Sequence, residues 1–410
     1  MRYCFIVAIS RLDYYNFDLV IPDLKEDTRF VLITDFSYFP NISKKTASFF
    51  YSIHPFNEIT IDACSEVISK INEIILQNSV IVCSNEKLLM LCAKLREKYC
   101  MNGAKPYQYA VFESKRNTKQ CLSLSGIKVT ESFDFNGIDT SENLEEYHQF
   151  IFKLHNGKYV IKPLNGGGSE DTAIIKCYND LFHWYQVSFK VNEQYITEKF
   201  VDAELYHCDS FILNGEIKFA VASKYLFPNL YFTYGKPIIS YPEVDNVLVE
   251  KILKFNAKII TALNTPNGAA HLEFFVKNEE LIFLEIGPRS PGKSVVKCHE
   301  LNYGINLYEL TLRCELGIKS NFSVKPNMFH AIVCVPVKPG KVLALMNPQI
   351  KSNYEIEWLI KPGDVIRSLP TSLKDGVAAN LMLFNQNYYE LINDLLYFKK
   401  NSIYTISPIE

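Results

Sequence analysis

Two glutamates within a predicted β-hairpin have the residue type and spacing for metal chemistry. Glu273 and Glu285 lie in two apolar runs, at residues 269–276 and 281–286, which the polar turn 277–280 joins. A carboxylate among apolar strand residues is costly without a cation or donor, and two on facing strands also repel each other. Mg²⁺ would relieve both costs, because it takes oxygen ligands and joins carboxylates to phosphates. The hairpin alone leaves a second interpretation open, in which both side chains point to solvent.

Anion-binding groups lie on both sides of this hairpin in the sequence. Arg289 follows it, and its guanidinium suits a phosphate or a carboxylate. Upstream, Lys162 ends a strand predicted at 158–163, and the run Gly-Gly-Gly-Ser at 166–169 precedes a returning strand at 172–176. Consecutive glycines let backbone N–H groups approach an anion closely, although such a run is also typical of a plain hairpin tip. The lysine before the glycines and the serine after them favour phosphate binding.

The elements that must position these groups begin with an α/β unit. Apolar runs predict buried parallel strands, and helical spacing of apolar residues predicts helices between them. The strands are expected at 3–9, 30–34 and 80–83, and the helices near 63–76 and at 86–99. A further helix at 114–124 carries Lys115 and is followed by a new unit from residue 127.

The rest of the chain indicates α+β organisation. A hairpin across the Asn214-Gly215 turn is strongly predicted, and residues 227–242, rich in tyrosine and proline, are expected to be an irregular surface connection. The other predicted strands lie at 194–201, 329–337, 354–360, 364–369 and 378–385, and the helices at 247–263, 295–317 and 388–400.

Composition excludes several classes of protein. A formal net charge of -2 gives no reason to expect nucleic acid or an anionic membrane as a partner. The 11 cysteines are dispersed without a CxxC pair, which predicts reduced thiols in a cytoplasmic protein and no zinc site. The apolar start at residues 1–10 is too short for a signal sequence or a membrane span and is better interpreted as a buried strand. We therefore expect a soluble, cytoplasmic protein.

In their order along the chain, these features resemble the ATP-grasp superfamily, in particular its branch of L-amino-acid ligases and carnosine-synthase-like dipeptide ligases. The order is Lys115, Lys162 before the glycines, the strand end Thr-Glu-Lys-Phe-Val at 197–201, and Glu273 and Glu285 before Arg289. The resemblance covers nearly the whole chain. It implies an α/β N-terminal (pre-ATP-grasp, Rossmann-like) domain followed by α+β ATP-grasp domains with a β-rich C-terminal portion. The implied divisions are 1–110, 111–200 (the lid), 201–320 and 321–410.

The same resemblance implies ATP and Mg²⁺, with Mn²⁺ as an alternative ion, and a role for each matching residue. Glu273 and Glu285 are the implied metal ligands, and Arg289 and Lys162 the implied catalytic residues that stabilise the phosphoryl group. The implied nucleotide-binding residues are Lys115, Lys162, Gly166, Gly167, Gly168, Ser169, Glu198, Phe200, Val201 and Glu204. Among them, Glu198 to Val201 would read the adenine edge through the backbone, and Glu204 would hold the ribose. Two positions depart from the family pattern: Gly287 replaces an asparagine that ligates metal in many relatives, and Ser114 replaces an aspartate.

The chemistry implied is ATP-dependent ligation of a small carboxylate, such as an amino acid, to an amine through an acyl phosphate. The alternatives are a thiol or larger amine as the nucleophile, or a nucleotide-binding protein without activity, which would not need the acidic pair. Substrate recognition is expected from Glu86, His207, Asp209, Lys224, the 227–242 connection, Arg289 and Ser290. We expect His207 to be a structural strand histidine more than a base. The sequence leaves the oligomeric state open, although homodimers are common in the family that it resembles.

Overall fold

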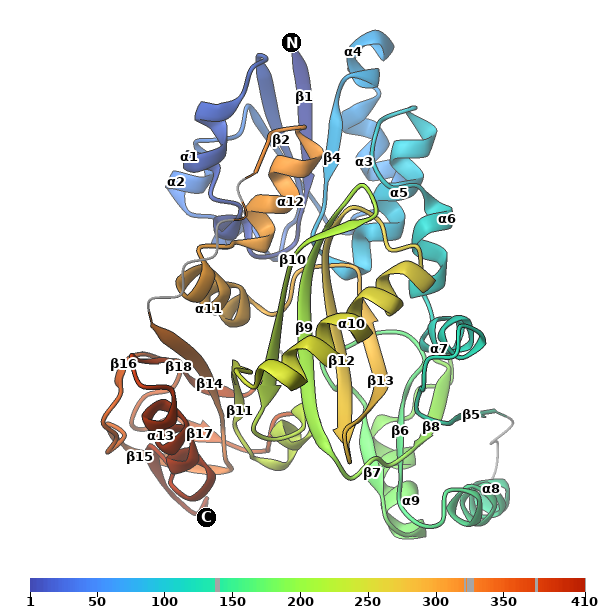
Figure 1. Ribbon diagram of the computed structural model, residues 1–410, viewed down its shortest axis with the longest axis vertical. Coiled ribbons are helices and arrows are strands. Elements are labelled where there is room, and N and C mark those ends of the chain that lie inside the picture. The colour runs from blue at the N-terminus through green and yellow to red at the C-terminus, as the bar shows by residue number, and fades with distance from the viewer. Residues whose placement is uncertain (137–140, 321, 323–327, 373–374, 410) are drawn as a thin grey trace.

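The computed structural model describes residues 1–136, 141–320, 322, 328–372 and 375–409, and its strands form four sheets (Figure 1). The N-terminal sheet is parallel, in the order β3-β2-β1-β4, as the α/β prediction requires. Its strands are β1 (Arg2–Val7), β2 (Thr28–Asp35), β3 (Ser52–Phe56) and β4 (Val80–Val82). The sequence did not predict β3, a half-buried edge strand that contains a proline, as edge strands tolerate.

Helices cover both faces of this N-terminal sheet. The helix predicted near 63–76 is two helices, α3 and α4, and the helix predicted at 86–99 begins as a short 3₁₀ turn at Glu86–Leu88. The other face packs against a helix from far along the chain, since Leu312 of α12 shares a core with Ile6 and Leu32 (Figure 1). The helices are α1 (Phe17–Val20), α2 (Lys44–Ala47), α3 (Ile61–Ile68), α4 (Glu73–Gln77), α5 (Leu89–Lys98), α6 (Pro106–Tyr109), α11 (Lys293–Tyr303) and α12 (Leu307–Glu315).

An eight-stranded sheet forms the centre of the molecule, in the order β13-β12-β9-β10-β11-β14-β18-β16. Alternation along β12 sends Leu272 and Phe274 to the face covered by α10 (Asn246–Ala262) and sends His271 and Glu273 to the opposite face. The predicted hairpin is therefore confirmed as β12 (Gly268–Lys277) and β13 (Glu280–Gly287). The remaining strands are β9 (Glu204–Leu213), β10 (Glu216–Tyr225), β11 (Ile238–Pro242), β14 (Phe329–Pro336), β16 (Asn353–Trp358) and β18 (Val377–Asn385).

The expectation of an irregular connection at 227–242 was wrong for most of that segment. Asn229–Tyr234 is a 3₁₀ helix, and β11 lies inside the central sheet between β10 and β14. Ile239 and Tyr241 are buried in the core there. The prolines that suggested a loop stand at the borders of these two elements: Pro228 precedes the 3₁₀ helix, Pro237 precedes β11 and Pro242 ends it, so none interrupts the middle of the strand.

A smaller antiparallel sheet, β5-β8-β6-β7, carries the glycine-rich segment between β6 and β7. Two helices that the sequence did not predict, α8 and α9, contribute Leu144, Ile151, Leu181 and Trp184 to its core. The helix α7 (Lys115–Leu124) leads from the N-terminal unit towards it (Figure 1). The elements of this unit are β5 (Ser132–Phe135), α8 (Ser141–Leu154), β6 (Tyr159–Pro163), β7 (Ala173–Ile175), α9 (Tyr178–Ser188) and β8 (Tyr195–Lys199).

The C-terminal portion is β-rich, as predicted, and its helix α13 (Tyr388–Lys400) packs on β14 and β18 of the central sheet. Its own three-stranded sheet has the order β17-β15-β19, formed by β17 (Val365–Ile366), β15 (Gly340–Leu345) and β19 (Tyr404–Ser407). Over the described residues, every helix is too short or too polar to cross a bilayer.

Candidate active site

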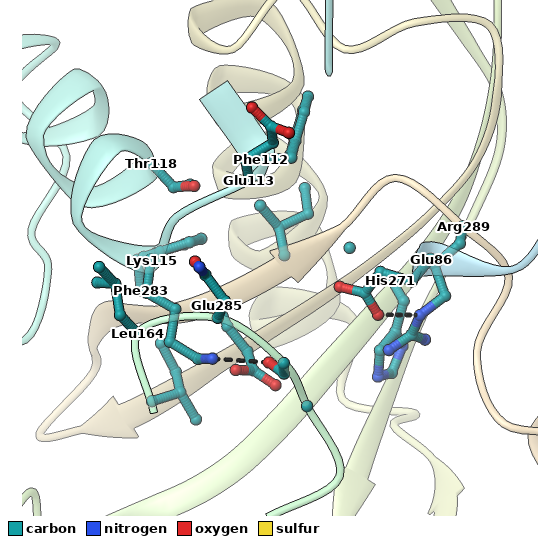
Figure 2. Close-up of a pocket in the computed structure, with 16 residues that line it drawn as sticks. Glu86, Phe112, Glu113, Lys115, Thr118, Leu164, His271, Phe283, Glu285 and Arg289 are labelled. Atoms are coloured by element: carbon teal, nitrogen blue, oxygen red, sulfur yellow. Dashed lines mark hydrogen bonds and ion pairs between the residues drawn. The ribbon is translucent and has the colours of Figure 1, made fainter. Parts of the chain in front are cut away.

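One pocket brings together residues from the N-terminal unit, α7, the glycine-rich segment and the central hairpin (Figure 2). Lys115 and Glu285 stand on one side of it, and Glu86, His271 and Arg289 on the other. Of the residues predicted to bind nucleotide, metal or substrate, those that line this pocket are Glu86, Lys115, Gly166, Gly167, Glu285 and Arg289. Segments far apart in sequence therefore converge here.

The two glutamates of the hairpin face each other. Glu273 and Glu285 are direct cross-strand partners, next to an irregularity in the ladder between Glu273 and Phe274. Glu273 is only 7% exposed and accepts a hydrogen bond from Asn229 Nδ2 at 2.7 Å, which excludes the solvent-facing interpretation for it. Burial and the neighbouring Glu273 charge raise the pKa of Glu285. Burial alone would raise the pKa of Glu273, but the hydrogen bond and the charge of His271 hold this pKa below the usual value. His271 compensates the charge of Glu273, whereas the charges of Lys115 and Lys162 offset the cost of ionising Glu285 only in part, since its pKa stays raised. A divalent ion between the two carboxylates would supply the remaining positive charge.

Arg289 occupies the space beside Gly287. Its Nε donates to Glu86 Oε2 at 2.8 Å and its Nη1 to the Ser290 carbonyl at 3.0 Å. A Cβ added to Gly287 would stand 3.3 Å from both Cγ and Nε of Arg289. An asparagine at this position would therefore crowd the arginine, so the departure from the family pattern makes room for this arrangement. Burial opposes ionisation of Glu86, yet the Arg289 charge and hydrogen bond lower its pKa.

Lys115 ties the glycine-rich segment to α7. Its Nζ donates to the carbonyl of Gly166 at 2.7 Å and to that of Pro163 at 3.3 Å. Gly166 has a φ of +99°, which non-glycine residues adopt only with strain. Burial lowers the pKa of Lys115, and the nearby Glu285 acts against that shift. The backbone of the segment is thus held at the edge of the pocket by a basic residue.

Lys162 and Glu198 meet in a buried ion pair behind this segment, with Nζ and Oε1 2.9 Å apart. The sequence prediction gave Glu198 a backbone role only, whereas its side chain is 3% exposed and binds a second lysine, Lys119. Burial acts against ionisation, but Lys119 and Lys162 lower the pKa of Glu198 to about 2. Sequence analysis missed Lys119, although its place four residues after Lys115 puts both lysines on one face of α7.

Other predicted nucleotide residues lie away from the lining of this pocket. The ring of Phe200 has Lys158 Nζ 4.3 Å from its centroid. Glu204 is exposed and accepts from Lys224 Nζ at 2.5 Å. Ser169 has a φ of 58°, so the segment makes a tight turn there. None of these residues, nor Gly168 or Val201, lines the pocket, so their nucleotide-binding roles stay predictions.

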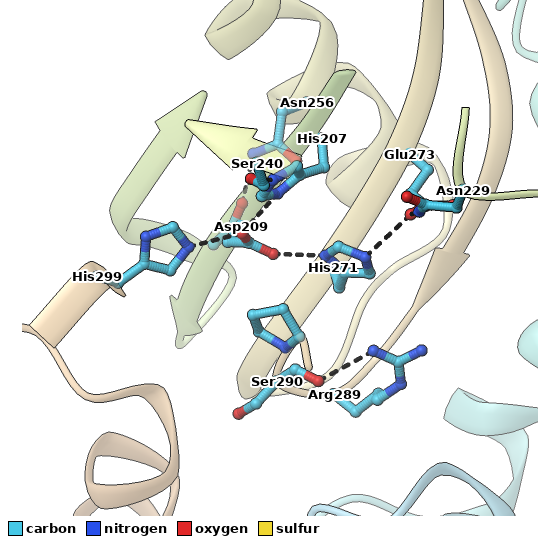
Figure 3. A network of polar contacts seen from close by, with 12 residues as sticks. His207, Asp209, Asn229, Ser240, Asn256, His271, Glu273, Arg289, Ser290 and His299 are labelled. Atoms are coloured by element: carbon cyan, nitrogen blue, oxygen red, sulfur yellow. Dashed lines mark hydrogen bonds and ion pairs between the residues drawn. The ribbon is translucent and has the colours of Figure 1, made fainter. Parts of the chain in front are cut away.

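Three histidines surround one buried aspartate beneath the pocket (Figure 3). Asp209 Oδ1 accepts from His271 Nδ1 at 2.6 Å, and its Oδ2 accepts from His207 Nδ1 at 2.8 Å and from His299 Nε2 at 2.7 Å. His271 Nε2 lies 3.4 Å from Glu273 Oε1. Against the effect of burial, His207 and His271 hold the pKa of Asp209 well below its usual value. The network therefore links α11 and two strands to a predicted metal ligand.

The expectation that His207 and Asp209 contact substrate was wrong, because both are fully buried. The preference for a structural His207 agrees with its second contact, 2.7 Å from Nε2 to Ser240 Oγ. The cluster is also a candidate metal centre by composition. Two ligands of a tetrahedral zinc ion would stand about 3.3 Å apart, however, which exceeds the hydrogen-bonding distances around Asp209. The sequence predicted these strands but left open which way their polar side chains point and which distant side chains meet there.

Comparisons with known proteins agree with this geometry. The chain is 26% identical over 322 residues to the L-arginine-specific L-amino acid ligase of Bacillus subtilis, covering 75% of this chain and 76% of that protein. Its fold matches the crystal structure of an L-amino acid ligase from Bacillus licheniformis, with a TM-score of 0.73, 14% identity and coverage of 100% and 99%. It also matches carboxyaminoimidazole ribonucleotide synthase from Asperigillus clavatus complexed with ATP, with a TM-score of 0.68, 13% identity and 97% coverage of each chain. No family model matches the chain.

The full-length structural matches define the fold as that of the ATP-grasp proteins, as the sequence predicted. Together with the sequence relative, they support an ATP-grasp ligase, which is an enzyme.

Proposed function

We propose that the chain joins a small carboxylate, in particular an amino acid, to an amine at the expense of ATP. The observation that carries the proposal is Glu285, which lines the same pocket as Lys115 and Arg289 and has the buried Glu273 as its cross-strand partner. Two neighbouring carboxylates that could hold a divalent ion, beside two basic groups, match the requirements of phosphoryl transfer. The name of the Bacillus subtilis relative supports an amino acid as the carboxylate.

ATP would lie between the small sheet and the central hairpin. We assign its binding to Lys115, Lys162, Gly166, Gly167, Gly168, Ser169, Glu198, Phe200, Val201 and Glu204. Glu273 and Glu285 would hold Mg²⁺, or Mn²⁺ in its place, and water or phosphate oxygens would complete the ligand shell. When bound, the ion neutralises negative charge on the transferring phosphoryl group.

The protein side chains then have distinct tasks. A carboxylate is a poor electrophile, so transfer of the γ-phosphoryl group from ATP to its oxygen gives an acyl phosphate with a good leaving group. The amine attacks the acyl carbon, and the amide, phosphate and ADP are released. Arg289 and Lys162 would offset the charge that develops on the phosphoryl oxygens. The 166–169 segment would exclude water from the acyl phosphate. All 11 cysteines are free, which supports our further proposal of a reducing, cytoplasmic location.

An assay of ADP release with a panel of amino acids, alone and in pairs, tests this function. We expect Mg²⁺-dependent ADP formation that rises at least tenfold with the right carboxylate and amine, together with a dipeptide or amide detectable by mass spectrometry. ATP hydrolysis that no acid or amine stimulates would refute ligation. Product formed with a thiol in place of an amine would point to the alternative nucleophile.

Glu86→Gln should raise the KM for the amino acid substrate about tenfold and leave the KM for ATP unchanged. Glu86 lines the pocket next to Arg289, and its lowered pKa keeps it anionic at neutral pH, so it complements an ammonium group while the arginine complements a carboxylate. Loss of one charged hydrogen bond corresponds to roughly a factor of ten. Steady-state kinetics with each substrate varied in turn measures both constants. An equal rise in both KM values would contradict this placement of the substrate.

A further inference from the structure

Lys119 is a buried lysine that the predicted catalytic cycle does not use. Its side chain is 3% exposed, and its ammonium binds Glu198 Oε1 and Thr130 Oγ1. The partner carboxylate comes from β8, 79 residues further along the chain. A buried lysine is costly, and hydrophobic side chains of similar volume often serve stability equally well. Packing alone therefore does not explain why a charged side chain is present at this position.

The two lysines share one carboxylate oxygen. Lys162 Nζ lies 2.9 Å from Glu198 Oε1, the same atom that accepts from Lys119, while Oε2 accepts from Thr130 Oγ1 at 3.0 Å. With both lysines protonated, the group carries a net charge of +1. Without Lys119, the Glu198 carboxylate would pair with Lys162 alone and neutralise it.

Of the two lysines, Lys162 is the one that the proposed function places against the nucleotide. It ends β6 and directly precedes the glycine-rich segment, whose Gly166 and Gly167 line the pocket. Lys115 lies one helical turn before Lys119 on α7 and also lines that pocket. Lys119 itself does not line the pocket and reaches Lys162 only through the shared oxygen of Glu198.

We propose that Lys119 is a positioning residue of the nucleotide site, which balances the charge of Glu198 so that Lys162 remains a net cation for the ATP phosphates. The inference rests on the proposed function, because it requires a nucleotide at Lys162. It differs from a merely structural role in one respect: the charge balance, and not the salt bridge itself, sets the affinity.

Charge-matched variants separate these two roles. K119M brings the net charge of the group to zero, and K119M/E198Q restores it to +1 without restoring any salt bridge to residue 119. We expect K119M to weaken binding of a non-hydrolysable ATP analogue with Mg²⁺ about tenfold, or about 1.4 kcal/mol, in titration calorimetry. K119M/E198Q should bind the analogue several times more tightly than K119M, because its group again carries a net charge of +1. K119R, which keeps the charge, should stay near the wild type.

Lys128→Met is the matched control, since it removes a lysine close in sequence that is 53% exposed and pairs with Glu280. It should leave nucleotide affinity unchanged. Thermal unfolding of each variant establishes that it is folded. If K119M does not fold, E198Q is compared with K119M/E198Q, and E198Q should bind the analogue several times more tightly because it has one more positive charge.

The outcomes are distinguishable. Wild-type affinity in K119M, or K119M/E198Q as weak as K119M, would overturn the inference and leave the nucleotide site standing. Equal affinities of E198Q and K119M/E198Q would do the same. No binding of the Mg²⁺-analogue complex by the wild-type chain would overturn the proposed nucleotide site and this inference together.

Discussion

Glu285→Gln is expected to lower ADP formation at least about a hundredfold and at the same time to leave the metal-free protein as stable as the wild type or more so. The loss of activity follows because a neutral amide is a poor ligand for Mg²⁺, whose charge stabilisation amounts to several kcal/mol. The gain in stability follows because, without the metal, the two negative carboxylates repel each other, and the variant removes one of these charges. Glu285 faces Glu273 across the hairpin, and burial together with that neighbour raises its pKa.

The sign of the stability effect follows from proton linkage. The folded protein holds the Glu285 proton to a higher pH than the unfolded chain, so ionisation lowers the free energy of unfolding as the pH rises through the usual range of a glutamate. Glutamine removes this penalty at neutral pH. ADP release and thermal unfolding, each with and without Mg²⁺, measure the two effects, and Mg²⁺ should stabilise the wild type more than the variant.

Glu280→Gln provides the control for this prediction. Glu280 begins the same strand, β13, but its side chain is 53% exposed and pairs with Lys128 at the surface. Exposed ion pairs contribute little, so both activity and stability should remain near wild type. Normal turnover by E285Q would refute the metal assignment, and a large loss of stability in metal-free E285Q would show that the glutamate pair is compensated by another group.

The features that the sequence predicted well are those that local patterns determine. The hairpin of β12 and β13 follows from two apolar runs around a polar turn, and the glycine-rich segment from consecutive glycines after a strand. The fold class followed from the order of such features. The domain boundaries near residues 110, 200 and 320 remain predictions, as do the individual site roles.

The features that the sequence missed depend on contacts between distant segments. The role of Lys119 depends on its contact with Glu198. The role of Asp209 depends on its contacts with histidines on its own strand, on β12 and on α11. Of these contacts, only that between His207 and Asp209, two residues apart on β9, is local in the sequence. Gly287 is a further example. The sequence shows that it has no metal-binding side chain, but only the structure shows that Arg289 packs in the space where such a side chain would stand.

Asp209→Ala is expected to destabilise the protein by about 3–5 kcal/mol, which lowers the midpoint of thermal unfolding by on the order of 10 °C. The variant removes the acceptor of three buried imidazole N–H groups, from His207, His271 and His299, and leaves them without their partner. Unpaired buried donors keep their full desolvation cost. Asp209→Asn should cost less, because one oxygen acceptor remains at the centre of the network.

Differential scanning calorimetry with a helix-cap variant as the reference tests this prediction. Asp245→Ala removes a carboxylate that accepts two backbone N–H groups at the start of α10, near the surface, and such caps contribute about 1 kcal/mol. The difference in stability between the Asp209 variants and the wild type should also become smaller as the pH falls. The pKa of Asp209 lies well below its usual value, so its stabilisation is present above the unfolded pKa of about 3.9 and is lost below it. If Asp209→Ala proves no more harmful than Asp245→Ala, the histidine network does not anchor the strand that carries Glu273, and its position would have to be fixed by Asn229 and the hairpin alone.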